Sequence, residues 1–161
     1  MPQSPSTSRD KPYLTYKLDL LKTIATRAAD PYYLEAANLR VRELRVLRLI
    51  HAFPGIVPGV LRHRVELDKT LLAKNLALLE GRGLITRTPD PRDNRLQRLN
   101  LTEEGTRIWM LCEQIGRKLE GEMFADLGAA DMKVLDALLD RLLVSIDRWR
   151  QEHADDTETK A

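Results

Sequence analysis

Residues 67–105 carry most of the information about the fold, and they read LDKTLLAKNLALLEGRGLITRTPDPRDNRLQRLNLTEEG. Leucine recurs in the first part at the i, i+4, i+7 spacing of one helix face, at Leu72, Leu76 and Leu79. This spacing predicts a helix over residues 69–82. Asp68 is a suitable N-cap for that helix, and Gly83 supplies a C-terminal stop.

The residues after this helix predict a β-hairpin. The hydrophobic period changes after Gly83, and residues 84–88 and 95–101 are typical of two short strands. Residues 89–94 form a turn-rich tip that is too long for a two-residue hairpin turn. Thr102 then caps a long helix, whose first turn carries acidic residues where the helix dipole favours negative charge.

Helices are also expected on both sides of this stretch. Leucine and alanine at spacings of three and four predict a first helix over residues 13–29, which Pro31 ends. The other expected helices cover residues 41–52, 56–65, 102–127 and 131–150. The helices over 41–52, 56–65 and 69–82, followed by the hairpin, form a winged helix-turn-helix.

This order of elements predicts a mainly α fold with a small β-wing, in which a winged helix-turn-helix is flanked by N- and C-terminal helices. A chain of 161 residues suits one domain with an accessory element. We expect the winged-helix lobe at residues 40–101 and the helical flanks at residues 13–39 and 102–150. The polar ends, residues 1–12 and 151–161, are expected to be disordered.

The composition is that of a helix-rich protein without a membrane span. The sequence has 28 leucines but only 8 aromatic residues, and unbranched leucine favours helix. No apolar stretch approaches the roughly 20 residues that a bilayer span needs. The first 12 residues have no apolar signal-peptide region. Because the single cysteine, Cys112, cannot form an intrachain disulfide, we expect a cytoplasmic protein.

The charge is distributed unevenly along the chain. Residues 40–100 carry 13 basic and 6 acidic residues, a net charge of +7, whereas the remainder carries 13 basic and 18 acidic residues, a net charge of −5. A basic middle between acidic ends is expected where the middle meets a polyanion. A solvated basic surface without a partner is the alternative that charge alone leaves open.

The second helix of a helix-turn-helix lies in the DNA major groove. In this chain the residues expected opposite the leucine stripe of that helix are Asp68, Lys69, Thr70, Ala73, Lys74 and Ala77. Small Ala73 and Ala77 let the backbone approach the bases, and Lys74 can donate to guanine or phosphate. An ordinary amphipathic helix with a solvated charged face explains the same residues.

The hairpin tip carries arginines that suit the DNA minor groove. Arg92 and Arg95 lie at the expected turn, and Arg87 and Arg98 on the strands. A minor groove about 6 Å wide accepts such a tip, and its negative potential favours a guanidinium. A carboxylate two residues away, as in Asp90, can hold an arginine by a bidentate pair. A solvated loop with weak local ion pairs is the alternative.

Residues 67–105 resemble the MarR family of bacterial transcriptional regulators. The motifs are the L-D-K-[ST] entry to the recognition helix, its L-E-x-x-G-L-[IV] exit, the D-P-x-D-x-R wing and the L-x-L-T-x-x-G start of the next helix. A weaker resemblance covers V-L-x-L-I-x-x-x-P-G at residues 46–55 and the helical layout of residues 14–150.

The resemblance implies a homodimer whose N- and C-terminal helices intertwine and whose two winged lobes bind a palindromic DNA operator. It implies recognition-helix roles for Lys69, Thr70, Lys74 and Asn75. It places Arg92 in the minor groove, with Asp90 orienting it and Arg95 nearby. The leucine-rich flanks agree independently, because the apolar stripe at each end needs a partner to cover it.

The chain departs from the family pattern at two places. Lys74 stands where many members have arginine, and lysine lacks the rigid fork that suits guanine O6 and N7. The third helix of the chain, expected over residues 56–65, carries Arg62, His63 and Arg64, where the family more often has small or acidic residues. The candidate phosphate contacts are therefore Arg62, Arg64, Arg87 and Arg98. We expect DNA binding that depends strongly on backbone and wing contacts.

Family members commonly release DNA when a small aromatic or carboxylate effector binds between the dimerisation helices and the winged lobe. The candidate pocket residues by position are Tyr13, Tyr16, His51, Trp109 and Cys112. An aromatic residue on an apolar helix face can equally belong to the core, and no feature of the sequence selects one ligand. Cys112 fits an oxidation sensor or, more simply, a buried inert thiol.

The sequence favours a regulator over other classes of protein. His51, His63 and His153 have no metal-ligand spacing, so neither a metal site nor any cofactor is expected. Glycine-rich phosphate loops, G-x-S-x-G and catalytic Cys/His or carboxylate constellations are missing, so an enzyme is not expected. We expect a homodimeric regulator of transcription, a repressor by family habit, that binds double-stranded DNA. A winged-helix protein-interaction module without operator binding is the alternative.

Overall fold

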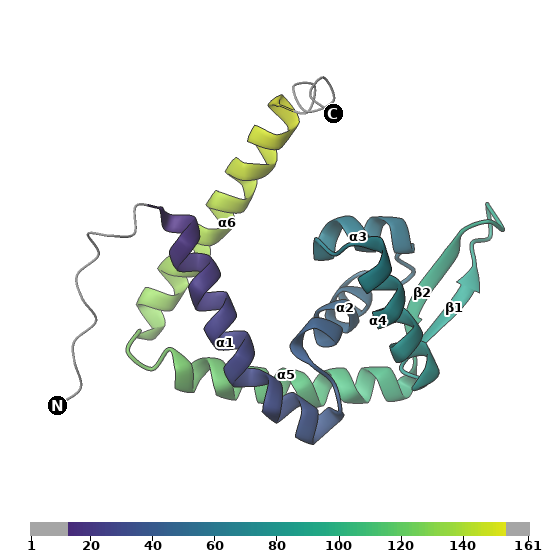
Figure 1. Cartoon of the computed structure of the whole chain (residues 1–161), viewed down its shortest axis with the longest axis horizontal. Coiled ribbons are helices and arrows are strands. Elements are labelled where there is room, and N and C mark those ends of the chain that lie inside the picture. The colour runs from purple at the N-terminus through teal and green to yellow at the C-terminus, as the bar shows by residue number, and fades with distance from the viewer. Residues whose placement is uncertain (1–12, 154–161) are drawn as a thin grey trace. The chain divides into compact units, whose positions relative to one another are not determined.

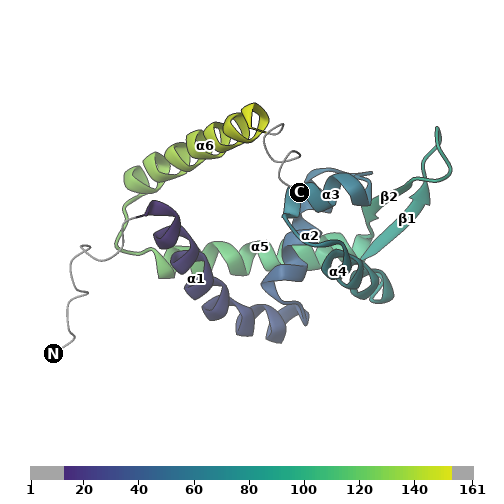
Figure 2. The ribbon, with the colours of Figure 1, turned by 45° about the horizontal axis from the view of Figure 1, so that its top comes forward.

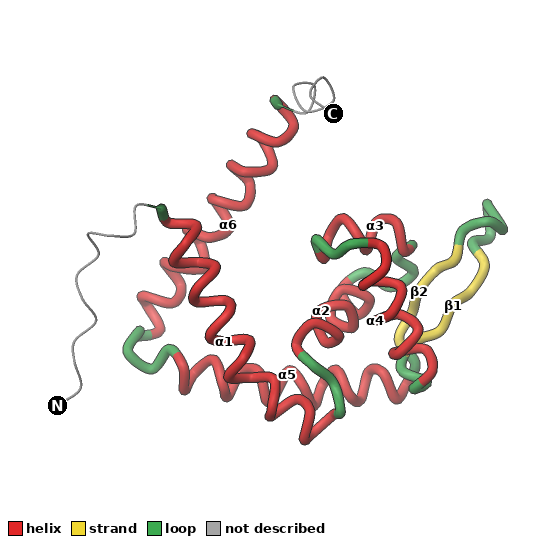
Figure 3. Tube along the Cα trace, in the orientation of Figure 1, coloured by secondary structure: helices red, strands yellow, loops and turns green. Residues whose placement is uncertain are grey.

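The computed structural model describes residues 13–153 as helices and one hairpin (Figure 1). The elements in chain order are α1 Leu14–Ala37, α2 Val41–Ala52, α3 Pro58–Val65, α4 Lys69–Gly81, β1 Ile85–Pro89, β2 Gln97–Leu101, α5 Glu103–Met123 and α6 Ala129–Glu152. The tube in Figure 3 shows that the hairpin supplies the only strands of this described range. The expected mainly α fold with a β-wing is confirmed.

The chain forms two compact units that divide between Glu120 and Gly121. The first contains α1 to β2 and most of α5, and the second contains α6. The expected tail at residues 1–12 lies outside the described residues, as does 154–161. Helix α6 continues to Glu152, so the expected C-terminal tail begins two residues too early, within the ordinary variation of helix ends.

The prediction that Pro31 ends the first helix is wrong. Helix α1 passes through Pro31 and ends at Asn38, which adopts the left-handed conformation with φ of 50°. Interior proline costs a helix about 3 kcal/mol, but Tyr33 and Ala37 beyond it are buried in the core. Packing of this last turn therefore outweighs the local preference.

Helices α2, α3 and α4 form the helix-turn-helix core, with α2 packed against both of the others. Proline begins α3, where its missing N–H costs nothing. The expected N-cap of α4 is confirmed, because Asp68 Oδ1 accepts a 2.8 Å hydrogen bond from the backbone N–H of Leu71. Leu72, Leu76 and Leu79 are buried as their spacing predicts.

The wing is an antiparallel hairpin that extends beyond the helices of the lobe in two views (Figures 1 and 2). Ile85 pairs with Leu101, and Pro89 with Gln97. A third segment joins its base, because Gly55 N–H donates to Leu99 O and Leu99 N–H donates to Ile56 O. The sequence did not indicate this bridge, since residues 55–56 read as a helix stop and a helix start.

Helix α5 begins against the base of the wing. The Thr102 hydroxyl donates to Gly83 O at 2.6 Å and accepts from the Gly105 N–H at 2.9 Å, which confirms Thr102 as a cap. Gly105 packs directly on the backbone of Leu84. These contacts fix the end of α4, the start of β1 and the start of α5 as one junction.

Candidate nucleic-acid interface

Helix α4 presents small and basic side chains on its exposed side. Lys69, Thr70, Ala73, Lys74 and Ala77 are all exposed, opposite the buried leucines. The short alanine side chains leave part of this face low, and the two lysines stand at the first residue of α4, Lys69, and near its middle, Lys74. The surface has the shape and charge that close approach to a DNA groove requires.

Asn75 lies on the opposite side of α4 from these residues. It is 3% exposed, three residues after Leu72 and one before Leu76, so helical geometry places it within the apolar stripe. Its Nδ2 has no hydrogen-bond partner in the described structure. The expectation that Asn75 faces the DNA groove is therefore corrected: its amide is enclosed in the lobe.

A hollow of about 360 Å³ lies between α3 and α4 beside β1. Its walls are Pro58, Gly59, Arg62, Lys69, Leu72, Ala73, Leu76 and Arg87. The three cations among these residues come from three different elements, so the tertiary structure gathers charge that is scattered in the sequence. Arg62 and Lys69, which have no carboxylate partner within the described residues, give one part of this hollow a charge that suits a phosphate group.

The wing tip is organised by Asp90. Its Oδ1 accepts from the backbone N–H groups of Arg92, at 2.7 Å, and Asp93, at 3.2 Å. Two guanidinium nitrogens of Arg98 each lie 2.7 Å from Oδ2. The Arg92 N–H lowers the pKa of the Asp90 carboxyl most, and Arg98 and the Asp93 N–H lower it further.

Asp90 therefore orients Arg92 differently from the bidentate pair expected. It fixes the backbone of Arg92, while its ion pair is with Arg98. The Arg92 and Arg95 side chains are exposed, and no carboxylate among residues 13–153 lies within ion-pair distance of either. The wing thus holds its backbone rigid and leaves two guanidinium groups available at the tip.

The four candidate phosphate contacts fall into two groups. Arg87 pairs with Glu80 at 2.9 Å, and Arg98 pairs with Asp90, so each already has a carboxylate partner. Arg62 borders the hollow, and the Arg64 guanidinium lies 4.1 Å from the centre of the Phe53 ring. Arg62 and Arg64 are the two whose charge no carboxylate neutralises within the described part of the chain.

The structure places two of the five candidate effector residues in direct contact. His51 and Trp109 stack with ring centroids 3.4 Å apart and an interplanar angle of 13°. Cys112 is fully buried, and burial raises the pKa of its thiol, which makes it a poor nucleophile. Tyr13 and Tyr16 are exposed near the start of α1. No group of three metal-ligating side chains occurs within residues 13–153.

Sequence reasoning missed a polar cluster next to Cys112. The Arg48 Nε donates to Glu113 Oε1 at 2.6 Å, joining α2 to α5. Burial raises the pKa of the Tyr33 hydroxyl, against the opposing effect of Arg48. Gly116 leaves room for that hydroxyl, since a Cβ there would lie 2.8 Å from it. The sequence gives little indication of this cluster, because its residues are far apart along the chain.

Comparison with known proteins identifies the group to which this winged helix belongs. A protein-family model, that of the MarR family, matches residues 37–96 of the sequence. These residues include α2, α3, α4 and β1. The multiple antibiotic resistance protein MarR of Escherichia coli K12 is 30% identical over 112 residues, covering 69% of this chain and 78% of that protein. The chain belongs to the MarR family.

Solved MarR structures share this fold. A crystal structure of MarR matches with a TM-score of 0.81 and 28% identity, covering 92% of this chain and 99% of that one. A mutant of MarR from E. coli, complexed with operator DNA, matches with a TM-score of 0.70 and 27% identity over 81% of this chain and 93% of that one. This MarR-family chain is therefore a DNA-binding regulator of transcription.

Among the helices of residues 13–153, none combines the length and the apolar composition of a membrane span. Relatives such as HosA of Escherichia coli and YybA of Bacillus subtilis carry names of transcriptional regulators.

Proposed function

We propose that this MarR-family chain binds a palindromic operator as a homodimer and represses transcription from it. The observation that carries the proposal is the pairing of two surfaces in one lobe. One is the low, basic face of α4, and the other is the wing tip with its two available arginines. Together they suit a major groove and the adjacent minor groove.

In this proposal Lys69, Thr70 and Lys74 read or contact the major groove, and Arg92 enters the minor groove with Arg95 beside it. Arg62 and Arg64 contact phosphates, because their charge is not neutralised by a neighbouring carboxylate. Arg87 and Arg98 act mainly by stabilising the wing, through their ion pairs with Glu80 and Asp90. Asn75 has no direct DNA contact.

The homodimer is supported by the apolar side chains of the flanking helices. Helix α6 has no buried residue, yet carries an exposed stripe of Leu135, Leu138, Leu142, Ile146 and Trp149. Helix α1 likewise exposes Leu14, Leu21 and Ile24. Surfaces of this kind mark protein–protein contacts. A two-fold dimer would place its recognition helices on half-sites about one DNA turn apart.

The proposal includes release by a small aromatic or carboxylate effector. The support is the stacked His51–Trp109 pair, which joins α2 of the winged lobe to α5. A flat aromatic acid that inserts beside this stack would alter the contact between these two helices. A panel of aromatic acids tests this, with release of bound DNA and quenching of tryptophan fluorescence expected together.

DNA binding is tested by titrating labelled intergenic DNA from beside the gene with the protein at several salt concentrations. Specific binding that weakens steeply as salt rises is expected, since each neutralised phosphate releases counterions. A scrambled sequence of equal length is the control. Flat salt dependence, or equal affinity for the scrambled DNA, would favour the protein-interaction module instead. A transcription assay with the same promoter tests repression.

A further inference from the structure

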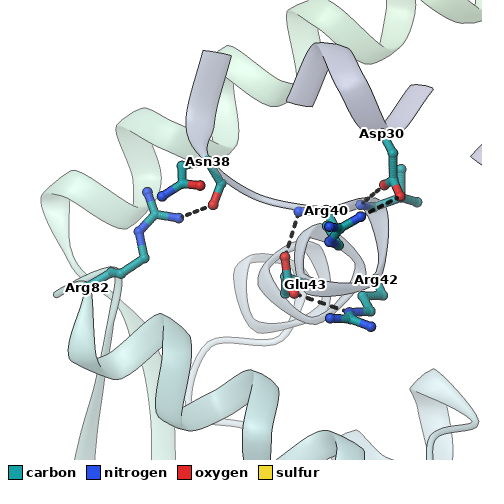
Figure 4. Close-up of polar contacts among 7 residues, drawn as sticks. Asp30, Asn38, Arg40, Arg42, Glu43 and Arg82 are labelled. Carbon is teal, nitrogen blue, oxygen red and sulfur yellow. Dashed lines mark hydrogen bonds and ion pairs between the residues drawn. The ribbon is translucent and has the colours of Figure 1, made fainter. Parts of the chain in front are cut away.

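The end of recognition helix α4 is joined to the end of α1 by one side chain. Arg82, the C-cap residue of α4, donates from Nη1 to Asn38 O at 2.7 Å and from Nη2 to Ala37 O at 2.8 Å. Figure 4 shows the Arg82 side chain reaching across to Asn38. Residues 44 positions apart in sequence are thus held together by a charged fork.

The C-terminus of α1 needs a cation from elsewhere in the fold. Its last turn contains no basic residue, and the Asn38 cap turns the chain away from the helix. The final carbonyl groups of a helix lack intrahelical donors and carry partial negative charge. Arg82 supplies two hydrogen-bond donors and a full positive charge to these carbonyl groups. The resulting hydrogen bonds are charge-assisted, and the planar guanidinium group fixes their geometry.

The α1 end is a firm point of attachment. Asp30 Oδ1 accepts from the backbone N–H of Val41 at 2.7 Å, which ties α1 to the start of α2. Glu43 accepts from the Arg40 N–H at 2.6 Å in the same corner (Figure 4). Leu39 between the two helices is fully buried. A hydrogen bond to Ala37 and Asn38 therefore attaches α4 to a fixed corner.

The residues after Arg82 are attached to a third helix. Gly83 O accepts from the Thr102 hydroxyl, and Leu84 O accepts from the Thr102 N–H at 3.1 Å. The C-terminal end of α4 is therefore held between α1 and the start of α5. Because a helix is stiff along its length, fixing this end sets the direction in which its exposed face points.

We propose that Arg82 is a positioning residue for DNA binding: by joining α4 to the C-terminal carbonyls of α1, it sets the orientation of the recognition helix. The proposal rests on the proposed function, because DNA is the ligand whose affinity reports that orientation. Arg82 acts through its hydrogen bonds to Ala37 and Asn38 and contacts no phosphate. It also makes the orientation of α4 depend on α1, which carries part of the exposed apolar surface described above.

The test compares Arg82→Gln, Arg82→Lys and the control Arg107→Gln by DNA titration at several salt concentrations. Arg107 is an exposed arginine that pairs along α5 with Glu104, so its loss matches the change in charge. For Arg82→Gln we expect DNA affinity to fall roughly three- to tenfold, a part of what two hydrogen bonds from a charged donor contribute. Arg82→Lys should recover part of this, because it keeps the charge but lacks the fork.

The salt dependence separates positioning from contact. Removing a phosphate contact lowers the slope of log affinity against log salt by about one, whereas loss of Arg82 should leave the slope unchanged. A slope that falls by this amount, wild-type affinity in Arg82→Gln, or an equal loss in Arg107→Gln would each overturn the proposal. Wild-type protein that binds no DNA would overturn the proposed function as well, so the two failures are distinguishable.

Hydrogen exchange gives a second readout that does not depend on a well-folded variant. In the wild-type protein, bound DNA should slow amide exchange at Asn38 and Leu39, because it stabilises α4 in the position that Arg82 requires. The exposed amides near the α5–α6 connection serve as the internal control. Protection confined to α4 and the wing would contradict the link to α1.

Discussion

Gly105 is the residue at which the junction of the wing and α5 tolerates least change. It is buried against Leu84, and a Cβ at this position would lie far inside van der Waals contact with the Leu84 carbonyl oxygen. The obstacle is backbone, which no side-chain rotation can relieve. The requirement for glycine here therefore comes from close packing of two chain segments, and not from a special φ angle.

Gly105→Ala is expected to lower the free energy of unfolding by about 2 kcal/mol or more, because overpacking forces the backbone to shift. Gly121→Ala is the matched control in the same helix, where nothing lies within 4 Å of an added Cβ. That change should be neutral or stabilise by about 0.5 kcal/mol. Urea denaturation of both variants measures the difference, and equal stability would contradict the packing argument.

Asp90 gives the wing tip a pH dependence of definite sign. Its hydrogen bonds from the Arg92 and Asp93 N–H groups and its pair with Arg98 lower its pKa from a usual value near 3.8. A carboxyl with a depressed folded-state pKa contributes stability that is present above the unfolded pKa. That contribution is lost as pH falls through the folded-state value.

Asp90→Asn should therefore disorder the tip at neutral pH, and the wild type should come to resemble it only as pH falls through the depressed pKa of Asp90, below the usual value near 3.8. The amide signals of Arg92 and Asp93, followed by NMR from neutral pH down into the acid range, measure this. Asp93→Asn is the neighbouring control that keeps the Asp90 pair. A wild-type tip that keeps its amide shifts unchanged throughout this titration would show that the carboxylate does not hold it.

At the scale of elements, we expect the hairpin and α4 to make separate contributions to DNA binding. The wing tip is held by side-chain to backbone bonds, so its arginines are displayed at little further entropic cost on binding. Lys69, by contrast, stands at the first turn of α4 as a flexible point charge at the edge of the hollow. A rigidly displayed guanidinium should contribute more to affinity than a mobile ammonium group.

Arg92→Ala is expected to weaken operator binding more than Lys69→Ala, by roughly 1–2 kcal/mol against less than about 1 kcal/mol. Titration of both variants against the same DNA at fixed salt measures this. Glu103→Ala, on the exposed first turn of α5, is a control for substitution near the wing. Equal binding by the wild type and Arg92→Ala would remove the wing from the proposed interface.

At the scale of the whole molecule, the exposed apolar stripe of α6 needs a covering surface. Its leucines recur at helical spacing and none is buried. Burial of apolar area contributes about 25 cal/mol per Å² removed from water, so association through such a stripe can hold two copies together. Dimerisation would also double the number of recognition helices on one DNA.

If the proposed dimer forms through α6, Leu138→Glu combined with Leu142→Glu should convert it to a monomer, because the two changes place charges in the middle of the apolar stripe. Ala137→Glu is the control, since helical geometry places residue 137 on the opposite side of α6. Light scattering after gel filtration measures the mass. A monomeric wild type, or a dimeric double variant, would contradict the proposed role of α6.

The order of the elements could be predicted from the amino-acid sequence, because local signals mark each of them. The leucine stripe and Asp68 cap of α4, the turn-rich wing and the Thr102 cap all act over a few residues, and the structure confirms each. The motif resemblance to the MarR family rests on the same short-range patterns. Even the burial of Asn75 could have been predicted, because it lies three residues after Leu72 and therefore on the same face of the helix.

Which residues meet across the chain could be learned from the folded structure alone. In the folded structure α1 continues through Pro31, because the helical turn beyond the proline buries Tyr33 and Ala37. The fold also pairs Asp90 with Arg98 and brings Arg82 to the end of α1. Such contacts depend on the free energy with which distant segments of the chain pack together, and local sequence patterns do not determine that free energy. The helices and strands can therefore be predicted from the sequence, whereas the attachment of the recognition helix to the rest of the protein cannot.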